Sequence, residues 1–418
     1  MSFFQRFVPA SDLLKLPAVR WLVASRFFAD LFFYSTTIVL FQEQRGLNFT
    51  QMFLMETFLS VGIWFAELPT GFLADRIGYS RLIVGGRALS LLGMILFASA
   101  YGFWWFTISN VLGGIAIACV SGCEGALLYS VLQPDKRSAQ GGAAFVLLRS
   151  ATSAGFFLGL LTGSFIGAYS PVLAVGASLL PLVFSLGAAL RLNHIVRGTP
   201  LPARDYQNRT QACEIVLLAW STMSNQPWLV CLSLFSSGVF AFTNAIFWYN
   251  QPYFERSGIA VFLFGPLMAG AMACQFLLLA RLPSLQKMLG TSLLLLLSCL
   301  LPGICYLLLS ALQTSLPTIG LVAGIVAFSA WQQPIVDNEL NKRIPDQSRA
   351  TVLSALSLTG SLLSVLLNPL IGHLGDLGLH EVGLGLGLGL IFLGLLAPWL
   401  LRYQKQLKPS SEEIESLF

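Results

Sequence analysis

The sequence predicts an all-α membrane protein of twelve transmembrane helices, and two observations support that prediction. The chain of 418 residues is 56% hydrophobic and only 10% charged, whereas about a quarter of the residues of a soluble domain are charged. Apolar runs of about 20 residues, the length that crosses a bilayer as a helix, recur from one end of the chain to the other. Their centres lie near residues 30, 61, 92, 117, 154, 182, 239, 269, 301, 327, 361 and 393.

The length of these runs favours helices over a β-barrel. Barrel strands alternate in polarity over about ten residues, but the runs here are about twice as long and apolar on all sides. The stretch "GLGLGLGLG" (383–391) does alternate. Its long apolar flanks still predict a helix, with a glycine-rich surface.

The distribution of basic residues predicts the orientation in the membrane. With the N-terminus in the cytoplasm, 19 of the 24 Lys and Arg fall on cytoplasmic segments, and the outer loops hold only Arg45 and Arg256. This bias predicts that both termini lie in the cytoplasm. The expected location is a bacterial inner membrane. The net charge of +5 therefore reflects membrane topology, and no nucleic-acid partner is expected. No cleavable signal peptide is expected in the first 15 residues.

The chain divides into two halves that resemble each other. The longest polar stretch follows the sixth helix, so the sequence predicts a six-helix bundle over 1–192, a cytoplasmic linker over 193–228 and a second bundle over 229–418. "EQRG" (43–46) matches "ERSG" (255–258), and "QPDKRSA" (133–139) matches "IPDQSRA" (344–350), both at an offset of 211–212. Two pseudo-symmetric bundles with a site between them are typical of secondary transporters.

The loop between the second and third helices reads "GFLADRIGYSR" (71–81). It resembles the cytoplasmic motif Gly-x-x-x-Asp-Arg-x-Gly of the major facilitator superfamily, matched by Gly71, Asp75, Arg76 and Gly78, with Arg81 one place late. The two glycines are expected to let the helices turn sharply. The resemblance implies that Asp75 contacts the start of helix 11 and so keeps the cytoplasmic side of the transporter closed. The alternative is a loop whose charges only fix the membrane topology. The corresponding loop "ARLPSLQKMLG" (280–290) is expected to have lost the acid and the glycines.

The first predicted helix contains ionisable residues, which are costly in a membrane and usually mark a pathway. In "RFFADLFFYST", a continuous helix would place Arg26, Asp30 and Tyr34 on one face. Arg26 would lie about 14 Å along that helix, near mid-depth.

Helices 4 and 5 contain Glu124 and Arg149 at comparable depths. The family resemblance implies that helices 1, 4 and 5 line one cavity, so Arg26, Asp30, Glu124 and Arg149 are candidates for proton coupling. Alternatively, an Arg26–Asp30 pair and a Glu124–Arg149 pair only lock the helices together. Glu56, near the outer end of helix 2, is either a lone candidate or a solvated side chain.

The second half offers polar rather than charged candidates for the substrate cavity. On helix 10, "WQQPIVDNELNKR" places Gln333 and Asp337 on one face, which suits gating or substrate contact. On helix 7, Asn244 and Trp248 are candidates together with Tyr34 of helix 1, although such residues also form interfacial belts. This imbalance of charged residues between the halves predicts proton coupling in the first half and substrate contacts in the second.

Helix 5 contains a glycine at every fourth position, Gly155, Gly159, Gly163 and Gly167, which predicts close helix packing. It lacks the proline of the drug–proton antiporter motif, and Asn110 stands where those antiporters have an arginine on helix 4. The chain therefore resembles the known drug exporters only in part.

No enzyme activity is predicted, because the sequence has no phosphate-binding loop and no large cytoplasmic domain. Its seven Cys lack metal spacing, so neither a metal nor another cofactor is expected. The sequence favours a monomeric, proton-coupled exporter of a small amphipathic or drug-like compound, working by alternating access. Uptake of a small nutrient or metabolite is one alternative, and a non-transporting membrane receptor or scaffold is another.

Overall fold

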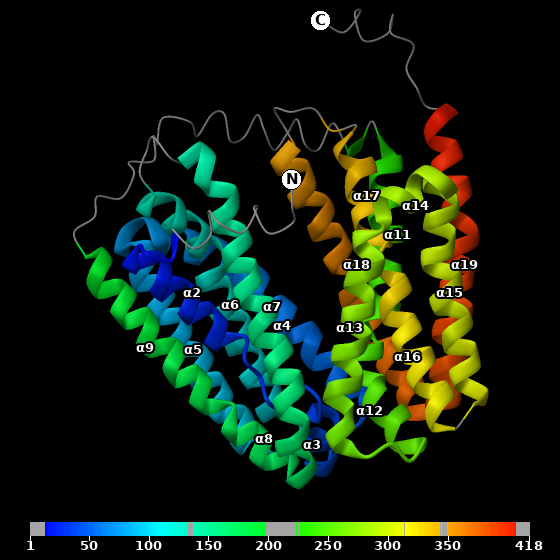
Figure 1. The fold of residues 1–418 in the computed structure, drawn as a ribbon, viewed down its shortest axis with the longest axis horizontal. Helices are drawn as coiled ribbons and strands as arrows, with labels where there is room; N and C mark the ends of the chain where they lie inside the picture. Colours follow the sequence, from blue (N-terminus) through cyan, green and yellow to red (C-terminus); the bar gives the residue numbers. More distant parts are fainter. Residues whose placement is uncertain are drawn as a thin grey trace, which may run out of the picture. The chain divides into compact units, whose positions relative to one another are not determined.

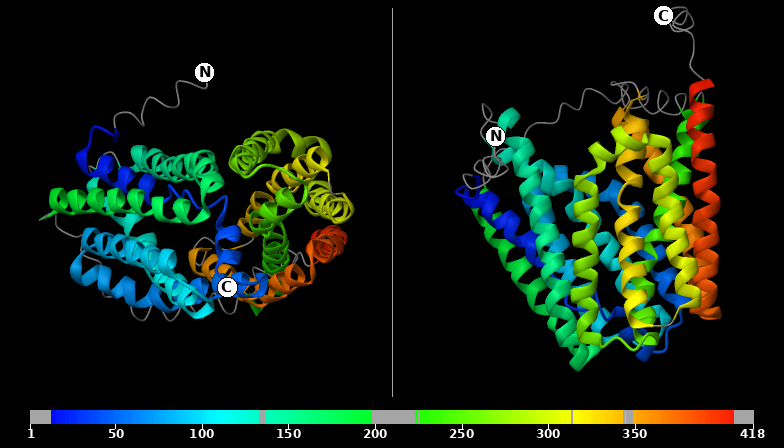
Figure 2. Two further views of the ribbon diagram at one scale, coloured as in Figure 1. Left: turned by 90° about the horizontal axis from the view of Figure 1, so that it is seen from below. Right: turned by 45° about the vertical axis from the view of Figure 1, so that its right-hand side comes forward.

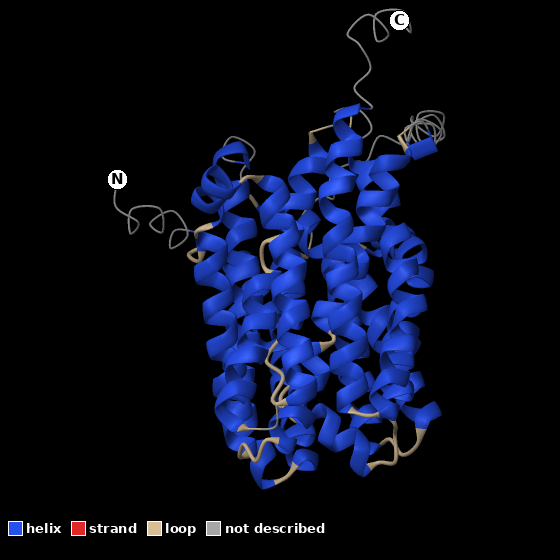
Figure 3. Ribbon diagram, turned by 90° about the vertical axis from the view of Figure 1, so that its right-hand side faces the viewer, coloured by secondary structure: helices blue, strands red, loops and turns tan. Residues whose placement is uncertain are grey.

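The computed structural model describes residues 13–132, 137–197, 223–224, 226–312, 314–342, 344 and 349–406. Most of the predicted linker 193–228 and parts of the "QPDKRSA" and "IPDQSRA" segments lie outside the described residues. Within them, the chain consists of helices and short connections, and no strand is present (Figure 3). This matches the all-α prediction.

The chain forms two compact units, Met1–Arg204 with Ala260–Ala269, and Asp205–Ile259 with Gly270–Phe418. The helices of the first unit are α2 (Pro17–Ala29), α3 (Ile38–Gln44), α4 (Phe49–Ile77), α5 (Tyr79–Ser99), α6 (Phe103–Val131), α7 (Arg137–Tyr169), α8 (Pro171–Ala177) and α9 (Leu179–Val196). Within this unit, α6 packs against both α4 and α5, while α2 packs against α7 and α9 (Figures 1 and 2). A core of small and branched apolar side chains fills the space between them.

The second unit is built in the same way. Its helices are α11 (Pro227–Asn244), α12 (Ile246–Arg256), most of α13 (Phe264–Ala280), α14 (Leu282–Leu289), α15 (Thr291–Ala311), α16 (Ser315–Ser329), α17 (Gln332–Asn341), α18 (Arg349–Leu377) and α19 (Leu379–Gln406). Helix α19 packs along α15, and α11 packs on α18 and α19. The short 3₁₀ helix η4 (Val261–Leu263) and the start of α13 belong to the first unit, where Ser164 Oγ donates to Phe262 O at 3.0 Å.

Eleven segments of the described chain are long and apolar enough to cross a membrane. They account for every predicted span except the first, centred near residue 30. That span is divided into α2 and α3 by the non-helical residues 30–37. The continuous helix that would place Tyr34 on the face of Arg26 and Asp30 is therefore wrong.

The structure adds geometric support to the internal repeat. Gly46 and Gly258 both have positive φ, 83° and 72°, and lie 212 positions apart. The preceding arginines reach equivalent carbonyls: Arg45 donates to Ala100 O at 3.0 Å, and Arg256 donates to Leu312 O at 3.3 Å. Each arginine thus binds the C-terminal end of a corresponding helix, where cations are favoured.

The turn of the cytoplasmic motif also recurs 212 residues later in the chain, which corrects one expectation. Gly78 separates α4 from α5 with φ 95°, and Gly290 separates α14 from α15 with φ 77°. The second-half loop has therefore kept this glycine, contrary to expectation. Gly71 lies inside α4, so the turn is made at Gly78 alone.

Candidate functional site

The interrupted first helix lies against the glycine stripe of α7. A Cβ atom on Gly155 would meet Phe27 O, and a Cβ on Gly159 or Gly163 would collide with the backbone of Phe32 or Phe33. The stripe therefore allows a non-helical backbone to lie directly on a helix, and close packing is its role, as predicted.

Hydrogen bonds fix the same segment. Asp30 N donates to Arg26 O at 3.2 Å and ends α2, and Phe33 N donates to Ser178 Oγ at 3.0 Å. Ser35 Oγ donates to Phe32 O at 3.0 Å. These bonds satisfy backbone groups that a continuous helix would pair internally, which is required inside a membrane.

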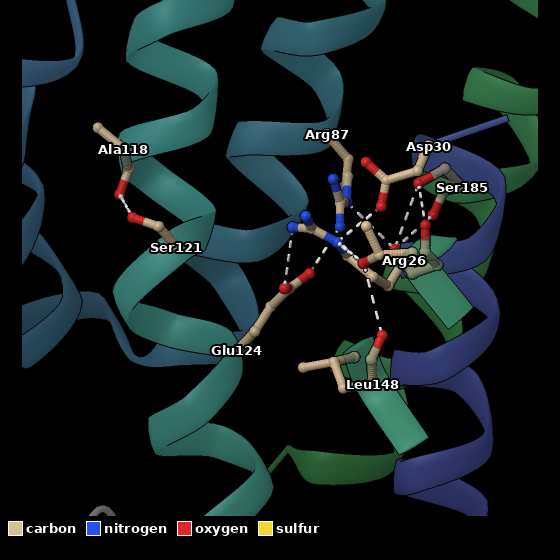
Figure 4. A network of polar contacts seen from close by, with 10 residues as sticks. Arg26, Asp30, Arg87, Ala118, Ser121, Glu124, Leu148 and Ser185 are labelled. Atoms are coloured by element: carbon tan, nitrogen blue, oxygen red, sulfur yellow. Dashed lines mark hydrogen bonds and ion pairs between the residues drawn. The ribbon is translucent and has the colours of Figure 1, made fainter. Parts of the chain in front are cut away.

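Four charged side chains meet in the middle of the first unit (Figure 4). Arg26 Nε lies 2.7 Å from Asp30 Oδ2, and Arg26 Nη1 lies 3.2 Å from Glu124 Oε2. Arg87 Nη2 binds the other oxygen of Glu124 at 2.6 Å. We call Arg26, Asp30, Arg87 and Glu124 the charge cluster; its two acids and two bases have a net charge of zero.

The cluster differs from the predicted set by one residue. Arg149 is exposed on α7, and no ion pair or hydrogen bond of its guanidinium occurs in the described part of the chain. Glu124 is paired with Arg87 on α5 and with Arg26 on α2, so the expected Glu124–Arg149 pair is wrong. The sequence did mark Arg87 as unusual, because it is one of three arginines within or at the start of apolar helices. It did not show which face of α5 the Arg87 side chain lies on.

Hydroxyl groups surround the cluster. Arg26 Nε donates to Thr152 Oγ1 at 2.8 Å, and Arg87 Nε donates to Ser25 Oγ at 3.3 Å. Ser185 Oγ in turn donates to Ser25 O at 2.7 Å. The network therefore joins α2, α5, α6, α7 and α9.

The two acids of the cluster have different surroundings. The Glu124 side chain is 6% exposed and is held by two arginines, whereas Asp30 is 19% exposed and, among the described residues, forms an ion pair with Arg26 only. Asp30 Oδ2 accepts no hydrogen bond despite its burial. The Asp30 side chain as a whole is therefore the more exposed of the two acids.

On α17 of the second unit, Gln333 and Asp337 share one face of the helix, as predicted. Gln333 Nε2 donates to Asp337 Oδ1 at 2.8 Å, and Ser236 Oγ of α11 donates to Gln333 Oε1 at 3.2 Å. Gln333 and Asp337 are exposed although they belong to a candidate membrane span. Carboxylates inside spans are costly next to lipid tails and are typically found facing a water-filled cavity or the interior of the helix bundle.

The remaining cavity candidates lie at or near helix interruptions. Asn244 is the exposed last residue of α11, just before the break at Ala245, and Trp248 is half-buried on α12. Tyr34 is half-buried in the break between α2 and α3, with its ring 5.7 Å from that of Phe97. The two breaks occupy corresponding positions of the repeat, since Ala245 lies 212 residues after Phe33.

The motif residues occupy the end of α4 and the start of α5. Asp75 is half-buried in the last turn of α4, while Arg76 and Arg81 are exposed. Nearby, Ser80 Oγ donates to Asn193 Oδ1 at 2.9 Å, which ties α5 to α9. Among the described residues, no three His, Cys, Asp or Glu side chains are grouped as metal ligands.

Comparison with known proteins supplies independent information. The family model described as "Major Facilitator Superfamily" matches residues 21–367. "Multidrug resistance protein MdtH" from Cronobacter sakazakii is 32% identical over 117 residues, 28% of each chain. MdtH from Citrobacter koseri is 29% identical over 144 residues, 34% of this chain and 35% of the relative. The chain thus matches about a third of the length of these curated relatives.

Solved structures match nearly the whole chain. A mutant of the nucleoside transporter NupG has a TM-score of 0.75 at 14% identity and covers 93% of this chain and 99% of its own. A mutant of the peptide transporter POT has a TM-score of 0.69 at 13% identity and covers 94% of both chains. At such identities the likeness concerns the fold alone.

Proposed function

The chain belongs to the major facilitator superfamily and is a multi-pass secondary transporter rather than an enzyme, and we propose that it is a proton-coupled exporter of small amphipathic or drug-like compounds. In this proposal it works by alternating access as a monomer in a bacterial inner membrane, with both termini in the cytoplasm. The similarity to MdtH over about a third of its length supports drug export.

The charge cluster is the observation that carries the proposal of proton coupling. Its four charges link three helices, α2, α5 and α6, through ion pairs of 2.6–3.2 Å. Protonating Asp30 or Glu124 would leave an arginine without its counter-charge in a medium of low dielectric constant. Because an uncompensated buried charge is strongly destabilising, the helices would rearrange, and this is how proton binding would drive a conformational change.

The second unit supports a substrate with a cationic group. Asp337 has an exposed carboxylate that accepts a hydrogen bond from the neutral amide of Gln333. The exposed side chains of Gln333 and Asn244 add uncharged hydrogen-bonding groups, and Trp248 supplies aromatic surface. Such a combination suits an amphipathic cation, which binds aromatic faces and a single acid.

The test is transport by the purified protein in proteoliposomes that contain a pH-sensitive dye. Ethidium, a nucleoside and a dipeptide serve as probes, with an imposed pH gradient in either direction. We expect ethidium to move against its gradient only when protons flow the opposite way. Asp30→Asn should lose this coupling, whereas the control Thr162→Ala on α7, whose hydroxyl only binds Leu158 O of its own helix, should keep it.

The alternatives predict other results. Accumulation of the nucleoside or the dipeptide together with protons would indicate uptake. Ethidium transport that ignores the pH gradient would overturn proton coupling. A receptor or scaffold is indicated if the protein moves none of the probes and cells with the Asp30→Asn variant behave like cells with the wild-type protein.

A further inference from the structure

Glu56 of the first unit belongs to neither the charge cluster nor the cytoplasmic motif. Glu56 lies on α4 within the candidate span Phe49–Glu67. It is seven residues from the start of the helix, so it lies about 10 Å along it. This end of α4 is the end that the distribution of basic residues assigns to the outside.

The carboxylate of Glu56 is half-buried and has no ion pair or hydrogen bond among the described side chains. Its backbone oxygen accepts a bond of 3.1 Å from Ser60 Oγ, but that bond does not involve the carboxylate. The two acids of the charge cluster, in contrast, are each paired with arginine.

Few ionisable groups surround Glu56. The outer part of α6 (103–117) contains no ionisable residue, and neither does the outer part of α5 (88–99). Tyr34, in the break between α2 and α3, is close enough to interact with Glu56 electrostatically. The nearest outer arginine, Arg45, is bound to Ala100 O and stacked on Tyr101, 3.8 Å from the ring centroid.

A carboxylate that is half-buried in a span without a cation is destabilised in its charged form. It gains stability by taking up a proton, and intramembrane acids of this kind commonly belong to proton pathways. The side chain of Glu56 is only partly buried, so part of it remains accessible from outside the unit.

We propose that Glu56 is a second proton-binding residue of the transport cycle, which is loaded from the outer side and is separate from the charge cluster. In this step a proton from outer water binds a carboxylate oxygen of Glu56 and makes it neutral, and release returns the proton to water on completion of the cycle. The proposal rests on the proposed proton coupling.

Infrared difference spectroscopy of the protein in nanodiscs tests proton binding without a substrate. Lowering the pH from neutral should produce a protonated-carboxyl band in the wild type, and Glu56→Gln should lack a component of it. Glu67→Gln is the matched control, because Glu67 is an exposed acid on the same helix. An unchanged spectrum for Glu56→Gln, in a variant with wild-type thermal stability, would overturn the proposal.

Proteoliposomes with ethidium and an internal pH dye test the role in transport. Glu56→Gln should keep ethidium exchange in the absence of a pH gradient. Its rate of proton-driven ethidium export should fall about tenfold or more. Glu56→Asp, which keeps a carboxylate, should restore part of the coupling and shows whether loss of export reflects misfolding. Wild-type protein that moves no protons would refute the proposed function itself; coupled wild type with an equally coupled Glu56→Gln variant would refute only the role of Glu56.

Discussion

Replacing Arg87 by Met tests the charge cluster most directly, because it removes the closer of the two cations that hold Glu124. The nitrogen–oxygen distances are 2.6 Å for Arg87 and 3.2 Å for Arg26. At an effective dielectric constant of about 20, unit charges at these distances attract each other by about 6 and about 5 kcal/mol. The cost of desolvating both ions opposes much of this attraction.

The net loss follows from the burial of the pair. Removing one partner of a buried ion pair costs about 3–5 kcal/mol, because the remaining charge is left uncompensated. The side chains of Arg87 and Glu124 are only 7% and 6% exposed, so solvent screening reduces the effect little. Since Arg26 still binds Glu124, we expect Arg87→Met to lower the free energy of unfolding by about 3 kcal/mol.

A double-mutant cycle measures this coupling. The wild type, Arg87→Met, Glu124→Met and the double variant are unfolded by denaturing detergent in mixed micelles. The double variant should be less destabilised than the sum of the two single variants by about 2 kcal/mol or more, because it removes both charges of the pair together. Arg20→Met, on an exposed arginine of α2, should change little. Strict additivity of the two single variants would refute an energetic link between Arg87 and Glu124.

The other predictions concern packing, substrate contact and the gate. Gly163→Ala should lower the free energy of unfolding by about 1–3 kcal/mol, because its methyl group would collide with Phe33 O, while Gly122→Ala, which meets nothing within 4 Å, should not destabilise the protein. Asp337→Asn should weaken ethidium binding about tenfold, measured by fluorescence anisotropy, and leave the binding of a neutral analogue unchanged. Asp75→Asn should slow ethidium export without changing its affinity; full-speed export would support the role of a topology-fixing loop.

The break in the first helix shows what the sequence could not predict. Residues 30–37 contain neither glycine nor proline, the usual signals of an interruption. The polar residues Ser35 and Thr36 were a weaker signal, since short hydroxyl side chains compete for backbone hydrogen bonds. The stronger cause lies far away in the sequence, in the glycine stripe of α7, which leaves room for a non-helical backbone.

The partner of Glu124 was unpredictable for a related reason. Hydropathy and spacing gave the spans, their approximate limits and the depth of each charged residue. They did not give the rotation of each helix about its axis, which decides whether Arg87 or Arg149 points at Glu124. The repeat was predictable because the turns that end its helices need glycine in one conformation, as at Gly46 and Gly258.

The repeat also identifies where the two units differ. At the offset of 212 residues, the positions equivalent to the charge cluster are occupied by uncharged residues; for Arg26, Asp30, Arg87 and Glu124 they are Gly238, Phe242, Cys299 and Val336. The shared fold therefore does not require these charges, since the second unit packs corresponding helices without them.

A structural role common to both units can therefore not explain the cluster. Keeping four ionisable groups in one unit, where their desolvation is costly, suggests a task that only this unit performs, and proton binding is such a task. If that division is correct, neutralising Asp337 in the second unit should change the affinity for cations but leave the number of protons moved per ethidium unchanged. A changed proton number in Asp337→Asn would mean that both units take part in coupling.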